Sequence, residues 1–434
     1  MSPLAVGLIG IAALFLLLAC SMPVAFAMAV VGAAGLLVLY GSGHTALSLV
    51  SMNIYDTFSD YGMTVVPLFI FMGQMTFHTG VSSKLFHAAY CWLGWIRGGL
   101  AMATVGACAA FGTICGSGPA TAATMAAVAL PEMRRFKYDD ALASGVVASG
   151  GGLGLMIPPS VVFIVYGILT EQSIGKLFIA GILPGFLCAL AFCVVVAAWC
   201  RINPKIAPGV IHATWRERFQ SLLGVWQIVL LFVLVLGGMF TGFFTPTEGA
   251  AVGAAGSVLV GALGGNVTWR NVRRATEETL RMSCMVMVII AGAKIFGAFL
   301  NVSELPTDLA AWLSGLRVAP WVVMLLIMLF YLIIGLFVDS LALILLSVPI
   351  FFPVVKQLGV DPVWFGVMVV LMTQMGVITP PVGVNVYVVN GVDRSIPLQT
   401  IFRGSVPFLL ALFVIAGLLM VFPGIATWLP QMVK

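Results

Sequence analysis

The chain has 434 residues, of which 61% are hydrophobic and 8% are charged, and its formal net charge is +5. With a mean hydropathy of +1.14 it has too little polar surface for a water-soluble globular protein. Its apolar runs are long and continuous, which excludes a β-barrel of alternating strands. The basic residues gather in a few loops and give no nucleic-acid signal. We therefore expect an all-α polytopic membrane protein that is embedded in the lipid bilayer and binds no nucleic acid.

The first part of the chain, residues 1–62, begins with two apolar runs at 4–20 and 23–40. They predict two helices joined by a tight turn, and the N-terminus lacks the basic region of a cleavable signal, so we expect a retained span. Residues 41–62 carry acidic side chains but no Lys or Arg. We expect this segment to be an acidic loop on the outer face.

The next part, residues 63–200, contains an apolar run at 98–132 that turns at Cys115–Thr121. Each arm is too short to cross a bilayer, so the pattern predicts a re-entrant hairpin with its tip deep in the membrane. Ser117 suits the N-cap of the second arm, and Pro119 suits its first helical turn.

A second apolar run, at 141–169, is long enough to span the membrane, yet its centre opposes helix formation. Residues 150–160 contain four glycines and the pair Pro158–Pro159. Glycine weakens a helix by about 1 kcal/mol, and proline removes a backbone donor. Broken backbone is tolerated in lipid only where it is buried in protein or lines a cavity. The break therefore predicts a functional site.

Residues 201–282 are expected to contain spans at 222–242 and 247–264 and two basic segments, at 201–218 and 270–281. With the basic cluster at 134–137, these segments hold more than half of the 20 Lys and Arg residues. The positive-inside rule assigns all three to the cytoplasm. Glu248, which follows Thr245, is interpreted either as an N-terminal cap at the outer interface or as part of a gate.

The last part, residues 283–434, repeats the pattern of residues 63–200. A hairpin is predicted at 320–354, and a broken helix at 362–390 contains Pro380–Pro381, 222 positions after the first Pro-Pro pair. Asp139 and Asp361 show the same offset. The cytoplasmic assignments make the two halves run in opposite directions, as in an inverted repeat. Paired interrupted spans in two halves point to a transporter site near the midplane of the membrane.

The two hairpin tips and two breaks supply helix ends directed at one volume. Helix N-termini favour carboxylates, whereas carbonyl and hydroxyl oxygens favour a hard cation such as Na⁺. One expected half-site contains Gly116, Ser117, Gly118, Thr121, Gly152, Gly154 and Ser160. The other contains Asp339, Ser340, Thr373, Gly376 and Thr379. For each hydroxyl, the alternative is a hydrogen bond to its own helix.

Asp339 is the most informative single residue, because a carboxylate inside an apolar span costs at least ~3 kcal/mol. We interpret it as a Na⁺ or H⁺ ligand, with a structural hydrogen bond as the alternative. Lys294 also lies within a span and is expected either to pair with an acid, to snorkel or to serve the transport path.

Other functional classes lack support. There is no Walker sequence, nucleophile elbow or metal-binding His-Glu pattern, so the sequence predicts neither ATP-driven transport nor an enzyme. An intramembrane protease would need paired aspartates or a Ser/His dyad within spans, and a channel would need a continuous polar pore. The eight cysteines show no metal-ligand spacing and are expected to be free thiols.

Four motifs resemble those of a known family. They are GSGPATAATM at 116–125, GLMIPPS at 154–160, FTPTEGAA at 244–251 and ITPPVGVN at 378–385. Together they resemble the large membrane subunit of TRAP transporters, the DctM type, and the resemblance covers essentially the whole chain.

This resemblance implies a Na⁺-coupled importer of organic acids, such as C4-dicarboxylates, keto acids or sialic acid, in the bacterial inner membrane. It implies an elevator-type transport domain that moves against scaffold helices near residues 1–60 and 222–264. Two partners are implied, a small four-helix membrane subunit of the DctQ type and a periplasmic substrate-binding protein of the DctP type. A stand-alone Na⁺/dicarboxylate symporter of related hairpin architecture remains the alternative.

The resemblance also divides the expected site between ion and substrate, with Na⁺ as the coupling ion and no organic cofactor. The sodium ligands are expected among Ser117, Gly118, Gly152, Gly154, Asp339, Ser340, Thr373, Gly376 and Thr379. The substrate contacts are expected among Gly116, Ser117, Thr121, Pro159, Ser160, Thr379, Pro381 and Asn385. The sequence does not identify the acid, because such glycines, hydroxyls and helix ends suit many carboxylates.

Overall fold

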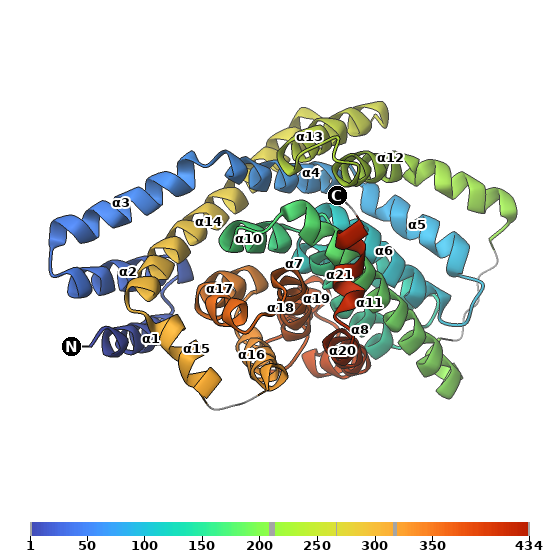
Figure 1. The fold of residues 1–434 in the computed structure, drawn as a ribbon. Coiled ribbons are helices and arrows are strands. Elements are labelled where there is room, and N and C mark those ends of the chain that lie inside the picture. The colour runs from blue at the N-terminus through green and yellow to red at the C-terminus, as the bar shows by residue number, and fades with distance from the viewer. Residues whose placement is uncertain (1, 208–212, 266, 316–318, 433–434) are drawn as a thin grey trace.

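The computed structural model describes residues 2–207, 213–265, 267–315 and 319–432. Within these ranges the chain forms 21 α-helices and two short 3₁₀ helices, without a strand (Figure 1). Five helices of the described part are long and apolar enough to cross a membrane, or up to seven if two bent pairs each count as one span. The predicted all-α membrane fold is confirmed.

The N-terminal region is helical almost throughout. Its elements are α1 (Pro3–Ala19), α2 (Val24–Tyr40), α3 (Gly43–Ser59), η1 (Tyr61–Thr64) and α4 (Val65–His78). The prediction of a loop at 41–62 is wrong, because α3 occupies most of this segment. Its polar side chains bond within the helix: Asn53 Nδ2 donates to the Leu49 carbonyl at 2.8 Å, and Thr57 Oγ1 donates to the Asn53 carbonyl at 2.7 Å. Packing against α2 and α14 then stabilises a helix that composition alone did not predict.

The first half of the site region contains the predicted hairpin and the predicted broken helix. Its helices are α5 (Val81–Leu93), α6 (Gly99–Cys115), α7 (Gly118–Arg135), α8 (Asp140–Gly151), α9 (Leu153–Met156), α10 (Val161–Thr170) and α11 (Ile174–Ile202). The Leu100 N–H donates to Tyr138 Oη at 3.4 Å, so the start of α6 lies beside the end of α7 and the pair is antiparallel.

The middle of the chain contains η2 (Pro204–Ile206), α12 (Trp215–Phe240), α13 (Pro246–Leu263), α14 (Trp269–Val302) and α15 (Leu305–Gly315). Residues 208–212 of the predicted basic linker lie outside the described part. Glu248 is a helix cap, since its carboxylate accepts from the Thr245 N–H at 2.8 Å and forms a capping box. The basic segment predicted at 270–281 belongs to α14, which continues for 34 residues.

The second half contains α16 (Pro320–Gly335), α17 (Ser340–Gln357), α18 (Pro362–Gly376), α19 (Val384–Val392), α20 (Leu398–Val421) and α21 (Gly424–Met432). The hairpin α16–α17 and the broken helix α18–α19 follow the same order as α6–α7 and α8–α10. Two hairpins and two broken helices are therefore present, as the sequence predicts.

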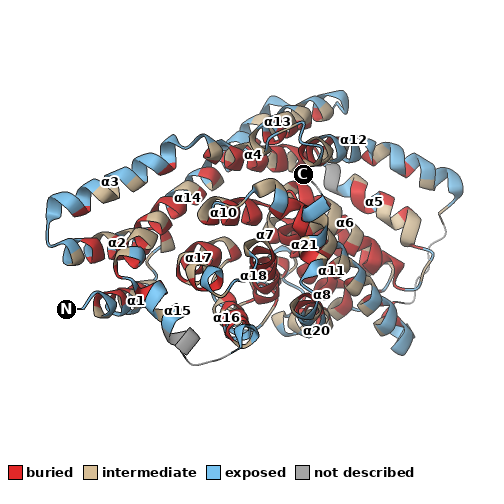
Figure 2. Ribbon diagram, viewed as in Figure 1, coloured by how far each residue is buried: buried red, intermediate tan, exposed pale blue. Residues whose placement is uncertain are grey.

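Most of the helices form an inner and an outer group. The inner group consists of α6–α11 and α16–α20, in which the broken helices are the most buried (Figure 2). The outer group is defined as α1, α2, α4, α13 and α14: α14 packs along α2 and α4, α13 packs on α4, and α1 packs on α2 (Figure 1). The two groups meet where α14 contacts α17 and α4 contacts α6.

Candidate functional site

The tip of the first hairpin rests on the first break. Gly116 ends α6 with a φ of +62°, which glycine adopts without strain, and Ser117 caps α7 by accepting from the Ala120 N–H at 3.5 Å. A Cβ on Gly116 would lie 3.2 Å from Val161 Cγ2 and 3.7 Å from the Pro159 carbonyl oxygen. The start of α7 and the start of α10 therefore lie close together.

The break itself is held by a contact between two glycines. A Cβ on Gly112 would lie 2.5 Å from Gly154 Cα, and a Cβ on Gly154 would lie 2.7 Å from Gly112 Cα. No side chain fits between these backbones. Helix α6 can therefore approach α9 closely only because both positions are glycine.

The second half repeats this contact with different residues. A Cβ on Gly376, at the end of α18, would lie 2.6 Å from the carbonyl oxygen of Gly335, at the end of α16. In both halves the first hairpin helix thus packs on the break of the following helix through glycine. This shared packing is the structural counterpart of the sequence repeat.

Asp339 lies at the tip of the second hairpin as the N-cap of α17. Its Oδ2 accepts from the Leu341 N–H at 3.1 Å, and the residue is half-buried. The structural alternative for Asp339 is therefore present, and its role as an ion ligand stays a prediction. The neighbouring Ser340 is buried, and its Oγ has no hydrogen-bond partner among the described residues.

Four further hydroxyls predicted for the site donate to carbonyl groups of their own chain segments. Each hydroxyl donates a hydrogen bond to the carbonyl oxygen of a residue three to five positions earlier. The pairs are Thr121 to Ser117 at 2.8 Å, Ser160 to Leu155 at 2.7 Å, Thr373 to Val370 at 2.8 Å, and Thr379 to Met375 at 2.6 Å. Each oxygen keeps lone pairs but has no free proton. These hydroxyls can therefore accept from a donor or ligate a cation, but they cannot donate to a carboxylate without breaking a bond.

Two side chains of the second half reach into the first break. Asn385 Nδ2 donates to the Ala148 carbonyl at 3.0 Å, and a Cβ on Gly118 would lie 3.6 Å from Asn385 Oδ1. Gln374 packs on Gly152, where a Cβ would lie 2.6 Å from Gln374 Cγ. The sequence predicted Gly118, Gly152 and Asn385 as site residues, and the structure brings them to the boundary between the halves.

Several polar atoms at this boundary have no hydrogen-bond partner among the described residues. They are both amide atoms of Gln374, Oδ1 of Asn385 and Oγ of Ser149, all in residues with 0% exposure. An unpaired buried polar group costs about 1–3 kcal/mol, so a cluster of them is typical of a site that receives water, ions or substrate. The sequence interpretation missed Gln374 and Ser149. One signal was available for Gln374, which lies 222 positions after Gly152.

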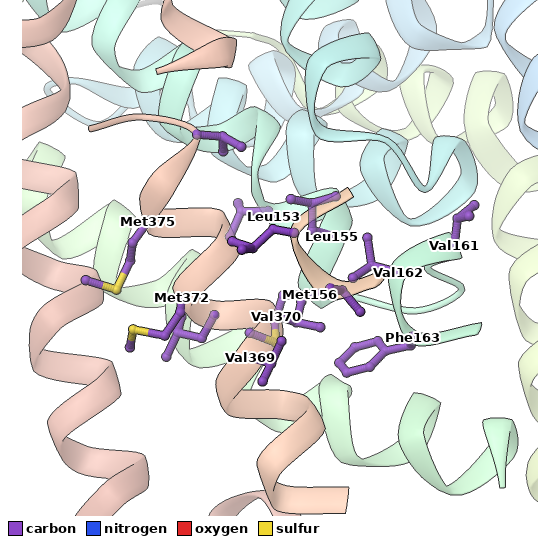
Figure 3. Packing of buried hydrophobic residues seen from close by; sticks show 14 of the residues in the cluster. Leu153, Leu155, Met156, Val161, Val162, Phe163, Val369, Val370, Met372 and Met375 are labelled. Atoms are coloured by element: carbon purple, nitrogen blue, oxygen red, sulfur yellow. The ribbon is translucent and has the colours of Figure 1, made fainter. Parts of the chain in front are cut away.

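Apolar side chains also pack at the first break. Met156 at the first break lies beside Val369 and Val370 of α18 (Figure 3). The proline pairs differ in their surroundings: Pro158–Pro159 and Pro380–Pro381 are both cis, yet Pro159 is buried and Pro381 is exposed. Pro381, predicted as a substrate contact, is therefore exposed, unlike the buried side chains of the polar cluster.

A cavity of about 500 Å³ lies between α14 of the outer group and α10 and α17 of the inner group. It is lined by residues of α3, α10, α14 and α17, among them Asp56, Glu171, Lys294 and Asn301. Lys294 forms no ion pair with any described residue. Its ammonium is therefore available on the surface where α14 faces the second hairpin.

The chain is similar to known transporter subunits over most of its length. A sequence model of the family "Tripartite ATP-independent periplasmic transporter, DctM component" matches residues 11–425. The chain is 36% identical over 405 residues to the C4-dicarboxylate TRAP transporter large permease protein DctM of Pseudomonas aeruginosa, with 92% of this chain and 93% of that protein covered. It is 34% identical over 417 residues to the sialic acid TRAP transporter large permease protein SiaM of Vibrio cholerae, with 96% of each covered.

Two further similarities extend this result. The 2,3-diketo-L-gulonate TRAP transporter large permease protein YiaN of Escherichia coli is 31% identical over 407 residues, with 93% of each chain covered. The crystal structure of the Alcanivorax borkumensis YdaH transporter matches with a TM-score of 0.65 over 88% of this chain and 89% of that one, at 17% identity, which indicates a shared fold alone. Because the family match spans nearly the whole sequence, this multi-pass membrane protein belongs to the DctM family of TRAP transporter large permeases.

Proposed function

We propose that this permease imports small organic acids together with Na⁺, working with a small membrane subunit of the DctQ type and a periplasmic binding protein of the DctP type in the inner membrane. The relatives named above are permeases for C4-dicarboxylates, sialic acid and 2,3-diketo-L-gulonate. All three substrate types are carboxylates at neutral pH, which supports an organic anion as substrate.

The observation that carries the proposal is the cluster of unpaired buried atoms of Gln374, Asn385 and Ser149 between two glycine-lined breaks. The amide of Gln374 supplies donors for a carboxylate. The N-termini of α7 and α10 add backbone N–H groups nearby. The back-bonded hydroxyls of Thr121, Ser160, Thr373 and Thr379 offer only lone pairs, which suits Na⁺. Substrate and ion would thus use different atoms of the same helix breaks.

The transport cycle that we infer is an elevator movement. The inner group carries both breaks, and the cavity of about 500 Å³ lies between it and α14 of the outer group. Movement of the inner group past α14 would change the side of the membrane from which the breaks are reached.

The test is uptake of labelled organic acids into proteoliposomes that contain this chain and its small partner, with and without binding protein and an inward Na⁺ gradient. We expect uptake to need both. The variant Asp339→Asn should lose about tenfold or more in rate, because a charged ligand at the hairpin tip contributes to ion binding. Asp361→Asn is the matched control, since Asp361 also caps a helix of the second half but is exposed.

Each result has a distinct meaning. Uptake without the binding protein would replace the tripartite mechanism by a stand-alone symporter, and uptake without Na⁺ would reject the coupling ion. Full activity of Asp339→Asn would remove Asp339 from the ion site.

A further inference from the structure

Two cavities of opposite character lie between α5 and α12, which pack side by side at one end of the molecule (Figure 1). The first has a volume of about 450 Å³ and is lined by apolar side chains of α5, α6, α11 and α12. The second has a volume of about 380 Å³ and is lined mainly by polar side chains of α5 and α12. Both cavities border the same turn of α5, where Leu85 lines the apolar cavity and Lys84 lines the polar one.

The two helices run antiparallel along the cavities. Trp92 Nε1 donates to the Arg218 carbonyl at 3.3 Å, and a Cβ on Gly224 would lie 3.9 Å from Lys84 Cβ. The Arg218 guanidinium lies 4.9 Å from the ring centre of Trp215. Tryptophan and arginine are typical of the membrane–water interface, and the basic start of α12 was assigned to the cytoplasm. The polar cavity therefore lies near the cytoplasmic interface.

The apolar cavity opens sideways, toward the surroundings of the protein. Three side chains at its lining are large, apolar and more than half exposed: Phe186 at 67%, Leu190 at 53% and Val229 at 54%. Among the described residues, Thr113 brings the one side-chain oxygen to the lining, and its Oγ1 donates to the Ala110 carbonyl at 2.8 Å. Water needs two to four polar partners in a cavity, so this space suits a hydrocarbon guest.

The polar cavity suits a phosphate group. Its lining includes Lys84, His87 and Ser221. Lys84 forms no ion pair within the described part of the chain. The one carboxylate of the lining, Glu217, already accepts from the Thr214 N–H at 2.7 Å and the Thr214 hydroxyl at 2.8 Å in a capping box. Thr214 thus engages one oxygen of the Glu217 carboxylate, whereas the Lys84 ammonium has no acidic partner among the described residues and can donate to a phosphate oxygen.

We propose that one phospholipid of the cytoplasmic leaflet binds between α5 and α12, with an acyl chain in the apolar cavity and its phosphate at Lys84 and His87. The apolar cavity is too small for a partner helix, since a helix with its side chains is about 10–12 Å wide and extends over many residues. The lipid fills the gap between α12 and the helices α6 and α11 of the inner group. It would also seal this gap against water without fixing the two sides to each other.

Gly106 offers a direct test. It lines the apolar cavity, and a Cβ at this position would meet no atom within 4 Å. Gly106→Leu therefore places its side chain in the space of the acyl chain. Gly417→Leu is the matched control, because a Cβ there also meets nothing within 4 Å but Gly417 lies on α20, away from both cavities.

The measurement is native mass spectrometry of the full chain, purified in detergent and supplied with phosphatidylglycerol. We expect one retained lipid in the parent and in Gly417→Leu, and about tenfold lower occupancy in Gly106→Leu, because displaced methylene contacts are lost. Lys84→Glu should lower the occupancy by a similar factor. Equal occupancy in the parent and Gly106→Leu would overturn the proposal.

A second measurement does not depend on the folding of a variant. Phosphatidylglycerol with a diazirine in its acyl chain is photolysed on the parent protein, and the labelled peptides are identified. Labelling of α6, α11 and α12 around the cavity supports the proposal. Labelling spread evenly over lipid-facing helices would overturn it. Loss of labelling at this cavity when the small partner subunit is bound would also overturn it, because the partner would then occupy the space.

Discussion

At the scale of single residues, Gln374 is the least satisfied side chain of the site. It is fully buried, and neither amide atom has a hydrogen-bond partner among the described residues. Its stem packs on Gly152, which directs the amide toward the first break. A buried amide without partners costs free energy, so its presence favours a role in binding over a role in stability.

We predict that Gln374→Leu separates stability from transport. Leucine removes two unpaired polar atoms, each of which costs about 1–3 kcal/mol when buried, so the unfolding temperature of the detergent-purified protein should stay equal or rise. Uptake in proteoliposomes should fall about tenfold or more, because a donor to the substrate is lost. Gln399→Leu, an exposed position on α20, is the control and should change neither property. A loss of stability without a loss of uptake would assign Gln374 a structural role.

Asp393 is the second informative residue, because it joins the two halves at a helix end. Its carboxylate lies 2.6 Å from Nη1 of Arg134. The Nε of the same arginine lies 3.0 Å from Oδ1 of Asp140. The pKa of Asp393 lies below its ordinary value of 3.8, mainly because the Ser395 hydroxyl donates to it at 2.6 Å, with further contributions from the Ser395 N–H and Arg134.

The sign of the pH dependence follows from this lowered pKa. The carboxylate stabilises the folded state above the unfolded pKa near 3.8, and this contribution is lost as the pH falls through the lower folded value. We predict that Asp393→Asn lowers the unfolding temperature near neutral pH by an amount equivalent to about 0.5–1 kcal/mol, as for an exposed ion pair. Thermal unfolding scans should show the difference shrinking below about pH 4. A difference that persists undiminished at lower pH would contradict this interpretation.

At the scale of elements, the glycine contact between α6 and α9 sets the distance between hairpin and break. We predict that Gly112→Ala destabilises the protein by about 1–3 kcal/mol, because its Cβ would lie 2.5 Å from Gly154 Cα and 2.8 Å from Gly154 N, which are backbone atoms. Gly106→Ala on the same helix has free space around the new Cβ and should stabilise by about 0.5–1 kcal/mol through helix propensity. Thermal unfolding of both variants is the measurement. Equal behaviour of the two would show that α6 and α9 separate easily.

At the scale of the whole molecule, the elevator proposal requires α17 to move past α14. A Cβ on Gly297 of α14 would lie 3.6 Å from Pro349 Cβ of α17, within the range for a disulfide. We predict that Gly297→Cys combined with Pro349→Cys transports normally when reduced and loses most uptake when oxidised. Dithiothreitol should restore it.

The control for this crosslink joins two helices of the outer group. A Cβ on Gly261 of α13 would lie 3.8 Å from Thr79 Cβ, next to the end of α4. Oxidation of Thr79→Cys with Gly261→Cys should leave uptake unchanged. Full uptake by the oxidised Gly297/Pro349 pair would rule out a movement of α17 along α14.

The sequence by itself determined the class of protein, the two hairpins and the two breaks. Apolar length, glycine and proline act locally, and Ser117 and Asp361 cap helices by bonds to residues two or three positions ahead. The offset of 222 positions then revealed the repeat without any structure. The resemblance to the family followed from four motifs, of which two lie at these breaks, one lies at the first hairpin tip and one joins α12 to α13.

The tertiary structure alone decided what the breaks contact. It formed α3 where composition predicted a loop, placed Gln374 on Gly152, and left Gln374, Asn385 and Ser149 with unpaired atoms. It also opened the cavities at α14 and at α12. These features depend on contacts between residues far apart in the chain, and such contacts leave no periodic or compositional signal in the sequence itself.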